Sequence, residues 1–262
     1  MKKLLSRLLP RAGTSRRAQP AFTAPVAPDR PLVAIGDIHG RADLLSVLDR
    51  RLEAECPGWP VVFLGDYVDR GEQSREVLEM LMAVSKEDKP EVTCLMGNHE
   101  RMLLDVLDNP ERATSRWLRN GGLQVLASFG VASPRGTSAD PTALYDMRDA
   151  LASAMGEAMI AWLRALPLMW QNGNVWALHA GADPKHPISE QTEDILLWGH
   201  PEFQSYPRAD GQWIVHGHTI VDTPYAENGC IAVDTGAYAT GRLSAAVIGD
   251  GDVRFLHTGQ DT

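Results

Sequence analysis

Residues 61–71 read Val-Val-Phe-Leu-Gly-Asp-Tyr-Val-Asp-Arg-Gly, an apolar run that passes through one glycine into three charged side chains. Four apolar residues without polar alternation are typical of a strand buried on both faces. The glycine that follows allows the backbone to turn sharply. The same order, an apolar run followed at once by glycine or polar residues, recurs at Leu32–Ile35, Val92–Met96, Val175–Leu178 and Trp213–Val215.

Segments with helical spacing separate these runs, which indicates the α/β class. Apolar residues at three- and four-residue intervals predict amphipathic helices around Leu44–Leu52 and Val77–Met82. We expect one domain over residues 31–262, with a helical insertion at about residues 112–168. Further strands are predicted at Cys230–Val233, Ser244–Ile248 and Val253–Leu256.

The charge is unevenly distributed along the chain. Residues 1–30 carry seven Lys and Arg against one acid, a net charge of +6, so the total of -9 leaves -15 on the remainder. An acidic body argues against nucleic acid as the main partner. The basic N-terminal arm, residues 1–30, is predicted to be disordered, with contact to a membrane surface or a partner protein as the alternative.

No apolar run approaches the roughly 18 residues that a transmembrane helix requires. The three cysteines are far apart in the sequence and form no Cys-x-x-Cys pair. They indicate neither a zinc knuckle nor a disulfide framework, and a reducing compartment suits them best. We therefore expect a cytoplasmic protein.

The ends of the five apolar runs quoted first carry Asp, His or Asn beside glycine. Ligands of open α/β sheets gather at the carboxyl ends of strands. Each such residue alone is better explained as a turn residue, but five in register with five strands favour a metal site. Carboxylate, imidazole and amide ligands without thiolate suit manganese, iron or zinc. Two adjacent cations need a bridging carboxylate, and Asp66 is the candidate.

These motifs resemble those of the calcineurin-like metallophosphoesterases. More narrowly they are similar to the phosphoprotein phosphatase family and its bacterial and phage lambda-type Ser/Thr phosphatases. The resemblance implies a β-sandwich of two mixed sheets flanked by helices, in four α/β/β/α layers. It extends over about residues 32–250 and rests on Gly36–Gly40, Gly65–Gly71, Gly97–Glu100, Trp117–Gly122, His179–Gly181, Gly217–Thr219 and Val233–Ala237.

The resemblance also implies the ligands of two divalent metal ions, manganese first and iron or zinc as alternatives. Asp37 and His39 would bind the first ion, and Asp66 would bridge the pair. Asn98, His179 and His218 would bind the second. His216 competes with His218 for this role, and the Gly-His-Thr register favours His218.

The remaining implied roles concern the phosphate. A hydroxide bridging the metals would attack phosphorus in line, while His99 protonates the leaving oxygen and Asp69 orients His99. Arg70 would bind the phosphate together with Asn98 and His200. His200 is a departure from the family pattern, because lambda-type relatives usually carry an arginine there, and imidazole cannot offer the same paired donors.

Three functions follow from these residues. The first is a protein Ser/Thr phosphatase, whose partner is a phosphorylated protein or peptide, or a small phosphoester. The second is a diadenosine tetraphosphate hydrolase of the same fold, although such enzymes usually carry Asp where this chain has Glu100. The third is a non-catalytic phosphoprotein-binding module, supported by His200 alone. Glu100 itself is interpreted as support for the start of a helix.

Overall fold

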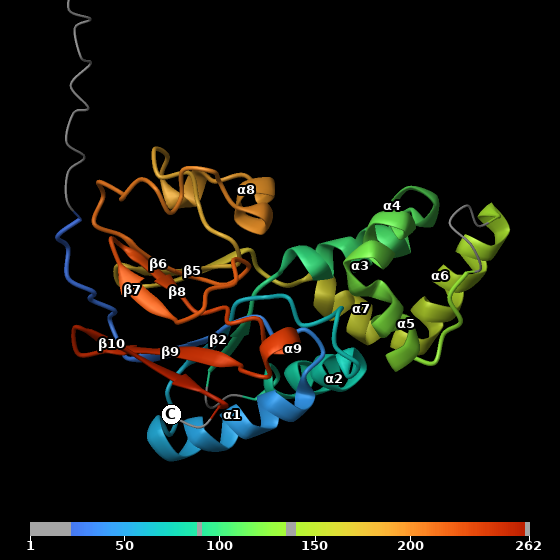
Figure 1. The fold of residues 1–262 in the computed structure, drawn as a ribbon, viewed down its shortest axis with the longest axis horizontal. Helices are drawn as coiled ribbons and strands as arrows, with labels where there is room; N and C mark the ends of the chain where they lie inside the picture. Colours follow the sequence, from blue (N-terminus) through green and yellow to red (C-terminus); the bar gives the residue numbers. More distant parts are fainter. Residues whose placement is uncertain (1–21, 88–90, 135–139, 260–262) are drawn as a thin grey trace, which may run out of the picture.

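The computed structural model describes residues 22–87, 91–134 and 140–259, which form two five-stranded mixed sheets (Figure 1). The first sheet has the order β10-β9-β1-β2-β3, with β1, β2 and β3 parallel and β9 and β10 antiparallel to their neighbours. Its strands are β1 (Leu32–Ile35), β2 (Val61–Phe63), β3 (Val92–Cys94), β9 (Ser244–Gly249) and β10 (Asp252–His257).

The second sheet has the order β4-β5-β6-β8-β7, with a parallel centre and an antiparallel strand at each edge. Its strands are β4 (Met169–Asn172), β5 (Val175–Leu178), β6 (Trp213–His216), β7 (Tyr225–Glu227) and β8 (Cys230–Ala232). The expectation of two mixed sheets flanked by helices is confirmed. The edge strands β4 and β7 were not among the expected strands.

Helices cover the outer faces of the sheets and gather at one end of them. Figure 1 shows α1 outside the first sheet, α8 outside the second, and α3 to α7 grouped beyond the strand ends. The helices are α1 (Ala42–Glu55), α2 (Ser74–Val84), α3 (Asn98–Asp108), α4 (Pro110–Trp117), η1 (Leu118–Gly122), α5 (Leu123–Ser128), α6 (Pro141–Met155), α7 (Glu157–Arg164), η2 (Ile188–Glu190), α8 (Glu193–Trp198) and α9 (Ala237–Thr240). None of the helices in the described ranges is long and apolar enough to cross a membrane.

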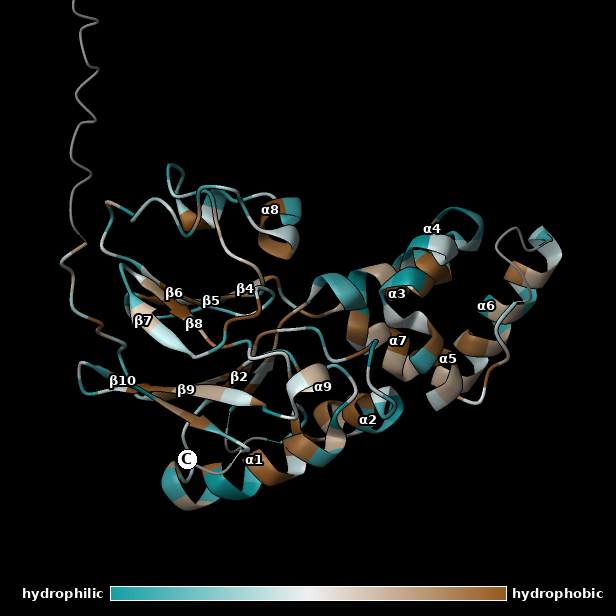
Figure 2. Ribbon diagram, viewed as in Figure 1, coloured by the Kyte–Doolittle hydropathy of each residue, from teal (hydrophilic) through white to brown (hydrophobic). Residues whose placement is uncertain are grey.

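The apolar side chains form separate layers on the two faces of each sheet. Leu64, Leu95, Val215 and Ile231 belong to the layer between the sheets. The opposite face of the first sheet packs on the helices, and the hydrophobic colouring in Figure 2 follows these inward faces. Burial on both faces explains why the central strands contain uninterrupted apolar runs.

Residues 22–30 differ from the expected disordered arm, whose residues 1–21 lie outside the described ranges. Val26 is buried against the layer between the sheets. Asn172 accepts hydrogen bonds from the backbone N–H groups of Asp29 and Arg30, and Asn174 accepts one from Ala27. The prediction was wrong for this stretch, because Val26 packs into the layer between the sheets and the side-chain amides of Asn172 and Asn174 satisfy the extended backbone.

Candidate metal centre

The five motif loops meet at one edge of the sandwich, because the parallel strands β1, β2, β3, β5 and β6 all lead into it. Loop backbones bond to each other there: the N–H groups of Ile38 and His39 donate to the carbonyl oxygen of Asp66 at 3.1 and 2.9 Å. The approach is so close that a Cβ atom on Gly97 would lie 2.3 Å from the Asp66 nitrogen. Glycine before Asn98 is therefore a steric requirement of the site.

Asp66 lies at the centre of the converging side chains and is almost completely buried. Its carboxylate oxygens are 3.5 Å from His39 Nε2, 3.3 Å from His179 Nε2 and 3.8 Å from His99 Nε2. Burial opposes its ionisation, but the neighbouring imidazoles hold its pKa below the usual value. Two groups of potential ligands share it: His39, Asp66 and His99 form one, and Asp66, His179 and His218 form the other.

Two of the imidazoles are oriented as metal ligands usually are. His39 Nδ1 lies 2.7 Å from the carbonyl oxygen of Val68, and His179 Nδ1 lies 2.8 Å from that of Leu64. Such contacts place the proton on Nδ1 and leave Nε2 with a free lone pair. Burial also keeps the rings neutral, lowering the pKa of His39 to about 3 and lowering that of His179.

Asn98 brings a further oxygen into the same place. Its Oδ1 lies 2.8 Å from His179 Nε2 and 2.9 Å from His218 Nδ1. His179 directs its Nδ1 proton to Leu64, so the Nε2 of the neutral ring is an acceptor. Asn98 Oδ1, which faces that Nε2, is an acceptor as well. Electron-rich atoms that face one another in a dry site are satisfied by a cation between them, so this donor set fits a metal ion.

Asp37 lies beside this group rather than within it. Its carboxylate accepts the backbone N–H of His218 at 3.1 Å, and a Cβ on Gly217 would lie 2.0 Å from its Oδ1. Burial and the negative charges of Asp234 and Asp66 raise its pKa well above the usual value. Asp234 was not anticipated from the sequence, although it is part of a recognised motif.

His99 forms a buried pair with Asp69. His99 Nδ1 lies 2.5 Å from Asp69 Oδ2, and the other side of the ring faces Asp66 and the Arg70 guanidinium, whose Nη2 is 3.3 Å from Nε2. Burial by itself would lower the pKa of His99, but the charges of Asp66 and Asp69 outweigh burial, so the net effect is a raised pKa. Burial raises the pKa of Asp69 to about 6, against the hydrogen bonds from His99 and Trp117. The pair can hold and deliver a proton at Nε2.

Arg70 is held at the rim by an aromatic side chain that the sequence did not suggest. Its Cζ lies 4.7 Å from the ring centroid of Tyr238, on α9. The same tyrosine ring lies 5.4 Å from the His39 ring, edge to face. Tyr238 therefore links the arginine to the metal centre by a cation–π contact.

Glu100 joins the loops beneath the site. It is fully buried and accepts the backbone N–H groups of Gly97, Asp66 and Tyr67 at 3.0, 2.8 and 2.8 Å, with a longer contact to Val68. Burial raises its pKa to about 8, while these donors favour the charged form. Its expected part as support for a helix start agrees with these contacts, but it supports the Asp66 loop as well.

His200 and His216 lie apart from these contacts. His200 is half-buried, accepts the Glu202 N–H at 3.2 Å and lies 3.8 Å from Asp183. No contact recorded within the described ranges joins it to His99 or Arg70, so its phosphate role stays a prediction. His216 is fully buried against Phe203, its ring 5.0 Å away.

Backbone strain is concentrated at this centre. Among the described residues seven other than glycine have a positive φ, and five of them are motif residues: His39, Asp66, Asp69, Arg70 and His218. Such conformations are uncommon for residues with a Cβ and persist only where the surrounding structure enforces them. The residues with strained backbone are therefore among those whose side chains converge at the candidate metal centre.

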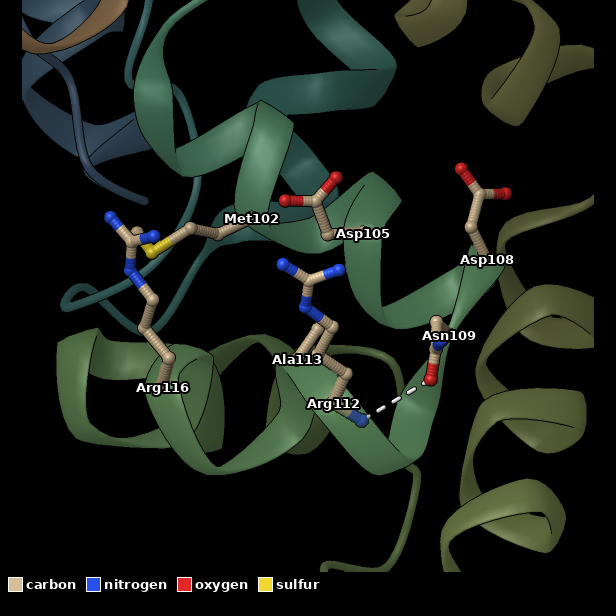
Figure 3. A pocket seen from close by; sticks show the side chains of 7 residues that line it. All are labelled: Met102, Asp105, Asp108, Asn109, Arg112, Ala113 and Arg116. Atoms are coloured by element: carbon tan, nitrogen blue, oxygen red, sulfur yellow. Dashed lines mark hydrogen bonds between the residues drawn. The ribbon is translucent and has the colours of Figure 1, made fainter. Parts of the chain in front are cut away.

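A separate cavity of about 370 Å³ lies between α3 and α4. Figure 3 shows the Arg112 guanidinium directed toward Asp105, and Arg116 beside Met102. Two arginines and two aspartates line the cavity, so their charges cancel, and Asp108 also forms an ion pair with Arg164. The cavity does not share the cluster of carboxylate and imidazole groups found at the strand ends.

Comparisons with known proteins show the family of the chain. The family model described as calcineurin-like phosphoesterase matches residues 30–222. A bis(5'-nucleosyl)-tetraphosphatase, PrpE of Bacillus velezensis, is 27% identical over 236 residues, which are 80% of this chain and 86% of that protein. A protein phosphatase 2A catalytic subunit of Dictyostelium discoideum is 38% identical over 71 residues, which are 27% of this chain and 22% of that protein.

Solved structures share the fold. A candidate diadenosine tetraphosphatase superposes with a TM-score of 0.61 at 21% identity, over 90% of this chain and 98% of that one. A cold-active protein-tyrosine phosphatase of a psychrophilic Shewanella species superposes with a TM-score of 0.56 at 20% identity, over 88% of this chain and 83% of that one. At these identities the likeness concerns the arrangement of the sheets and helices.

Proposed function

Because the chain belongs to the calcineurin-like phosphoesterase family, and is thus a metallophosphoesterase, we propose that it removes phosphate from serine and threonine residues of proteins. Proteins of this family use divalent metals. Two such ions, manganese first among them, would be held by Asp37, His39, Asp66, Asn98, His179 and His218. They would supply an activated water and offset the charge of the phosphate.

The buried pair of His99 and Asp69 carries this proposal. A serine or threonine alkoxide is a poor leaving group and needs a proton as the ester bond breaks. His99 offers one at Nε2, on the side of the ring that faces Asp66, while its Nδ1 is fixed 2.5 Å from Asp69. Arg70, 3.3 Å from that Nε2, would bind the phosphate oxygens.

The similarity to PrpE, over 80% of this chain and 86% of that protein, favours a second candidate, hydrolysis of a dinucleoside tetraphosphate. In that reaction a nucleotide phosphate departs, and it leaves more readily than an alkoxide. The general acid would then matter less, while the metals and Arg70 would act as before. The two candidates differ in the leaving group rather than in the site.

The test compares both substrates on the manganese-loaded protein. We expect phosphate release from a phosphoserine peptide to exceed turnover of diadenosine tetraphosphate, and His99→Asn to slow the peptide reaction by about 100-fold. His257→Asn, on β10, is the matched control and should retain full activity. Faster turnover of the dinucleotide would favour the second candidate, and no turnover of either substrate would refute both.

A further inference from the structure

The segment Trp117–Gly122 is not used by the proposed chemistry, yet it lies against it. It spans the end of α4 and the segment η1, where a non-helical turn at Gly121, with a φ of 110°, kinks the chain before α5. Sharp kinks between helical segments commonly occur at glycine. Here the turn meets the loop after β2 at two points, one on Asp69 and one on Arg70.

The first contact is made by the indole. Trp117 Nε1 donates to Asp69 Oδ1 at 2.8 Å, while the other oxygen of the same carboxylate holds His99 at 2.5 Å. Trp117 and Asp69 are both fully buried. Each oxygen of Asp69 therefore has one partner, and without the indole one oxygen would be left in a dry interior with no donor.

The indole itself is held by a glycine. A Cβ on Gly122 would lie 2.4 Å from the Trp117 ring, so the ring rests directly on bare backbone. This contact fixes the direction of the indole N–H. The geometry of the Asp69 carboxylate then follows from the packing of the helical layer.

The second contact is made by Gly121. Its carbonyl oxygen accepts the Arg70 N–H at 3.3 Å, and a Cβ on it would lie 2.5 Å from that nitrogen. Asp69 and Arg70 have φ values of 69° and 68°, a conformation that needs support from outside the loop. Gly121 provides that support at Arg70.

We propose that Trp117–Gly122 is a positioning segment, which holds the general-acid pair through Trp117 and the phosphate-binding arginine through Gly121. This inference rests on the proposed function of His99 and Arg70. Its contacts described above reach Asp69 and Arg70 rather than the candidate metal ligands. It acts by removing the freedom of the Asp69 carboxylate to rotate and of the Arg70 backbone to relax.

Trp117→Phe tests the first contact, because it keeps the ring and removes the N–H. On phenyl phosphate, whose leaving group needs a proton, we expect kcat to fall by about tenfold with KM unchanged. On p-nitrophenyl phosphate, whose leaving group needs little help, the loss should stay within about threefold. Trp176→Phe removes an indole hydrogen bond to Gln212 and should leave both rates unchanged.

A double-mutant cycle separates this inference from the function on which it rests. In a His99→Asn background, Trp117→Phe should cause no further loss on phenyl phosphate. If His99→Asn itself shows no dependence on the leaving group, the general-acid proposal fails. If the rate loss in His99→Asn depends on the leaving group, but Trp117→Phe slows both substrates equally, the positioning role of Trp117 is refuted.

Gly121→Ala tests the second contact independently, should the tryptophan variant fold poorly. Its Cβ would displace Arg70, so we expect KM and the inhibition constant for inorganic phosphate to rise by about tenfold. Gly130→Ala is matched to it, since Gly130 also has a positive φ, of 69°, but a Cβ there meets nothing within 4 Å. Equal phosphate inhibition in the two variants would refute the role of Gly121.

Discussion

At the scale of single residues, the metal centre gathers groups that destabilise the folded chain in the absence of ions. Asp37, Asp66 and Asp234 are buried near each other, and their charges repel. Strained backbone at His39, Asp66 and His218 adds about 1 kcal/mol or more for each residue. Bound cations would offset the repulsion, so stability and metal content should be linked.

The pH dependence of the metal-free protein tests this point. The pKa of Glu100 is raised to about 8 and that of Asp234 to about 6, mainly by burial, against about 4 in an unfolded chain. The folded state then binds more protons than the unfolded state over this range, so the free energy of unfolding falls as the pH rises through it. Buried histidines such as His218, with a pKa lowered to about 4, act in the opposite sense, and their effect fades above about pH 7.5, one unit over the pKa of an unfolded histidine.

We therefore expect the metal-free protein to lose about 1 kcal/mol of unfolding free energy between about pH 7.5 and pH 8.5, a window that lies above the titration of the histidines in the unfolded chain. Urea unfolding in the presence of a chelator measures this loss. Added manganese should raise the stability at pH 8.5 more than at pH 7.5, because ions stabilise the ionised carboxylates. A metal-free protein that is equally stable at both values contradicts the argument.

The chemistry of individual residues was the easiest part to predict from sequence. Asp66, Asn98 and His179 stand at strand ends close to glycine, and their side-chain types restrict what they can do. Trp117 was recognised only as part of a motif, because its partner Asp69 lies 48 positions away. An indole N–H can donate to many kinds of acceptor, so the sequence alone does not identify which residue accepts its hydrogen bond.

At the scale of elements, α3 connects the metal loops to the helical layer. Its first turn contains Asn98, His99 and Glu100, and the Glu100 side chain accepts backbone N–H groups from two loops. This combines a helix N-terminal cap with a contact between the loops that follow β2 and β3. The start of the helix and the position of Asp66 therefore depend on the same carboxylate.

Glu100→Gln tests this dependence. An amide in place of the carboxylate would turn an NH₂ group toward backbone donors, leaving buried groups unpaired. Above about pH 8, where Glu100 is ionised, we expect a loss of about 2–3 kcal/mol of unfolding free energy and weaker metal binding. Denaturant unfolding and metal titration measure the two effects. Glu76→Gln, exposed in the first turn of α2, should change neither, and similar behaviour of the two variants would contradict the role of Glu100.

Element prediction failed where burial was incomplete. The central strands have continuous apolar runs, whereas β4 reads Met-Trp-Gln-Asn and β7 reads Tyr-Ala-Glu. Both are edge strands that are buried on at most one face, so their sequences lack the apolar signal. β4 pairs with β5 and β7 pairs with β8, so each edge strand forms its hydrogen bonds with a more central strand of the sheet.

At the scale of the whole molecule, the residues alone indicated alternating strands and helices, and the two-sheet arrangement came only from the resemblance. The reason lies in long-range pairing. β9, near the end of the chain, inserts beside β1 and pairs Val33 with Val247. No local pattern in either strand encodes a partner more than two hundred residues away, although both carry the apolar residues that such a position requires.

The layer between the sheets should make the sandwich unfold as one unit, because it takes side chains from both sheets. Ile231, on β8, is fully buried in this layer, which also includes Leu64 and Leu95, the residues that directly follow β2 and β3. Ile231→Ala would leave a cavity against both sheets, and we expect it to destabilise the protein by about 2–5 kcal/mol. Ile220→Ala makes the same chemical change at a side chain that is 47% exposed and should stay within about 0.5 kcal/mol of the parent.

The course of unfolding gives the sharper test of this coupling. If the shared layer holds the sheets together, far-ultraviolet circular dichroism and tryptophan fluorescence will report one coincident transition for both variants. Three of the seven tryptophans, Trp170, Trp176 and Trp213, lie on strands of the second sheet, so fluorescence reports on that sheet as well as on the helical layers. A fluorescence midpoint that falls in Ile231→Ala while the dichroism midpoint holds would mean that the sheets unfold separately. The loops of β2 and β3 could then not be kept in register with those of β5 and β6 by this layer, and ligand convergence would have to come from the metals themselves.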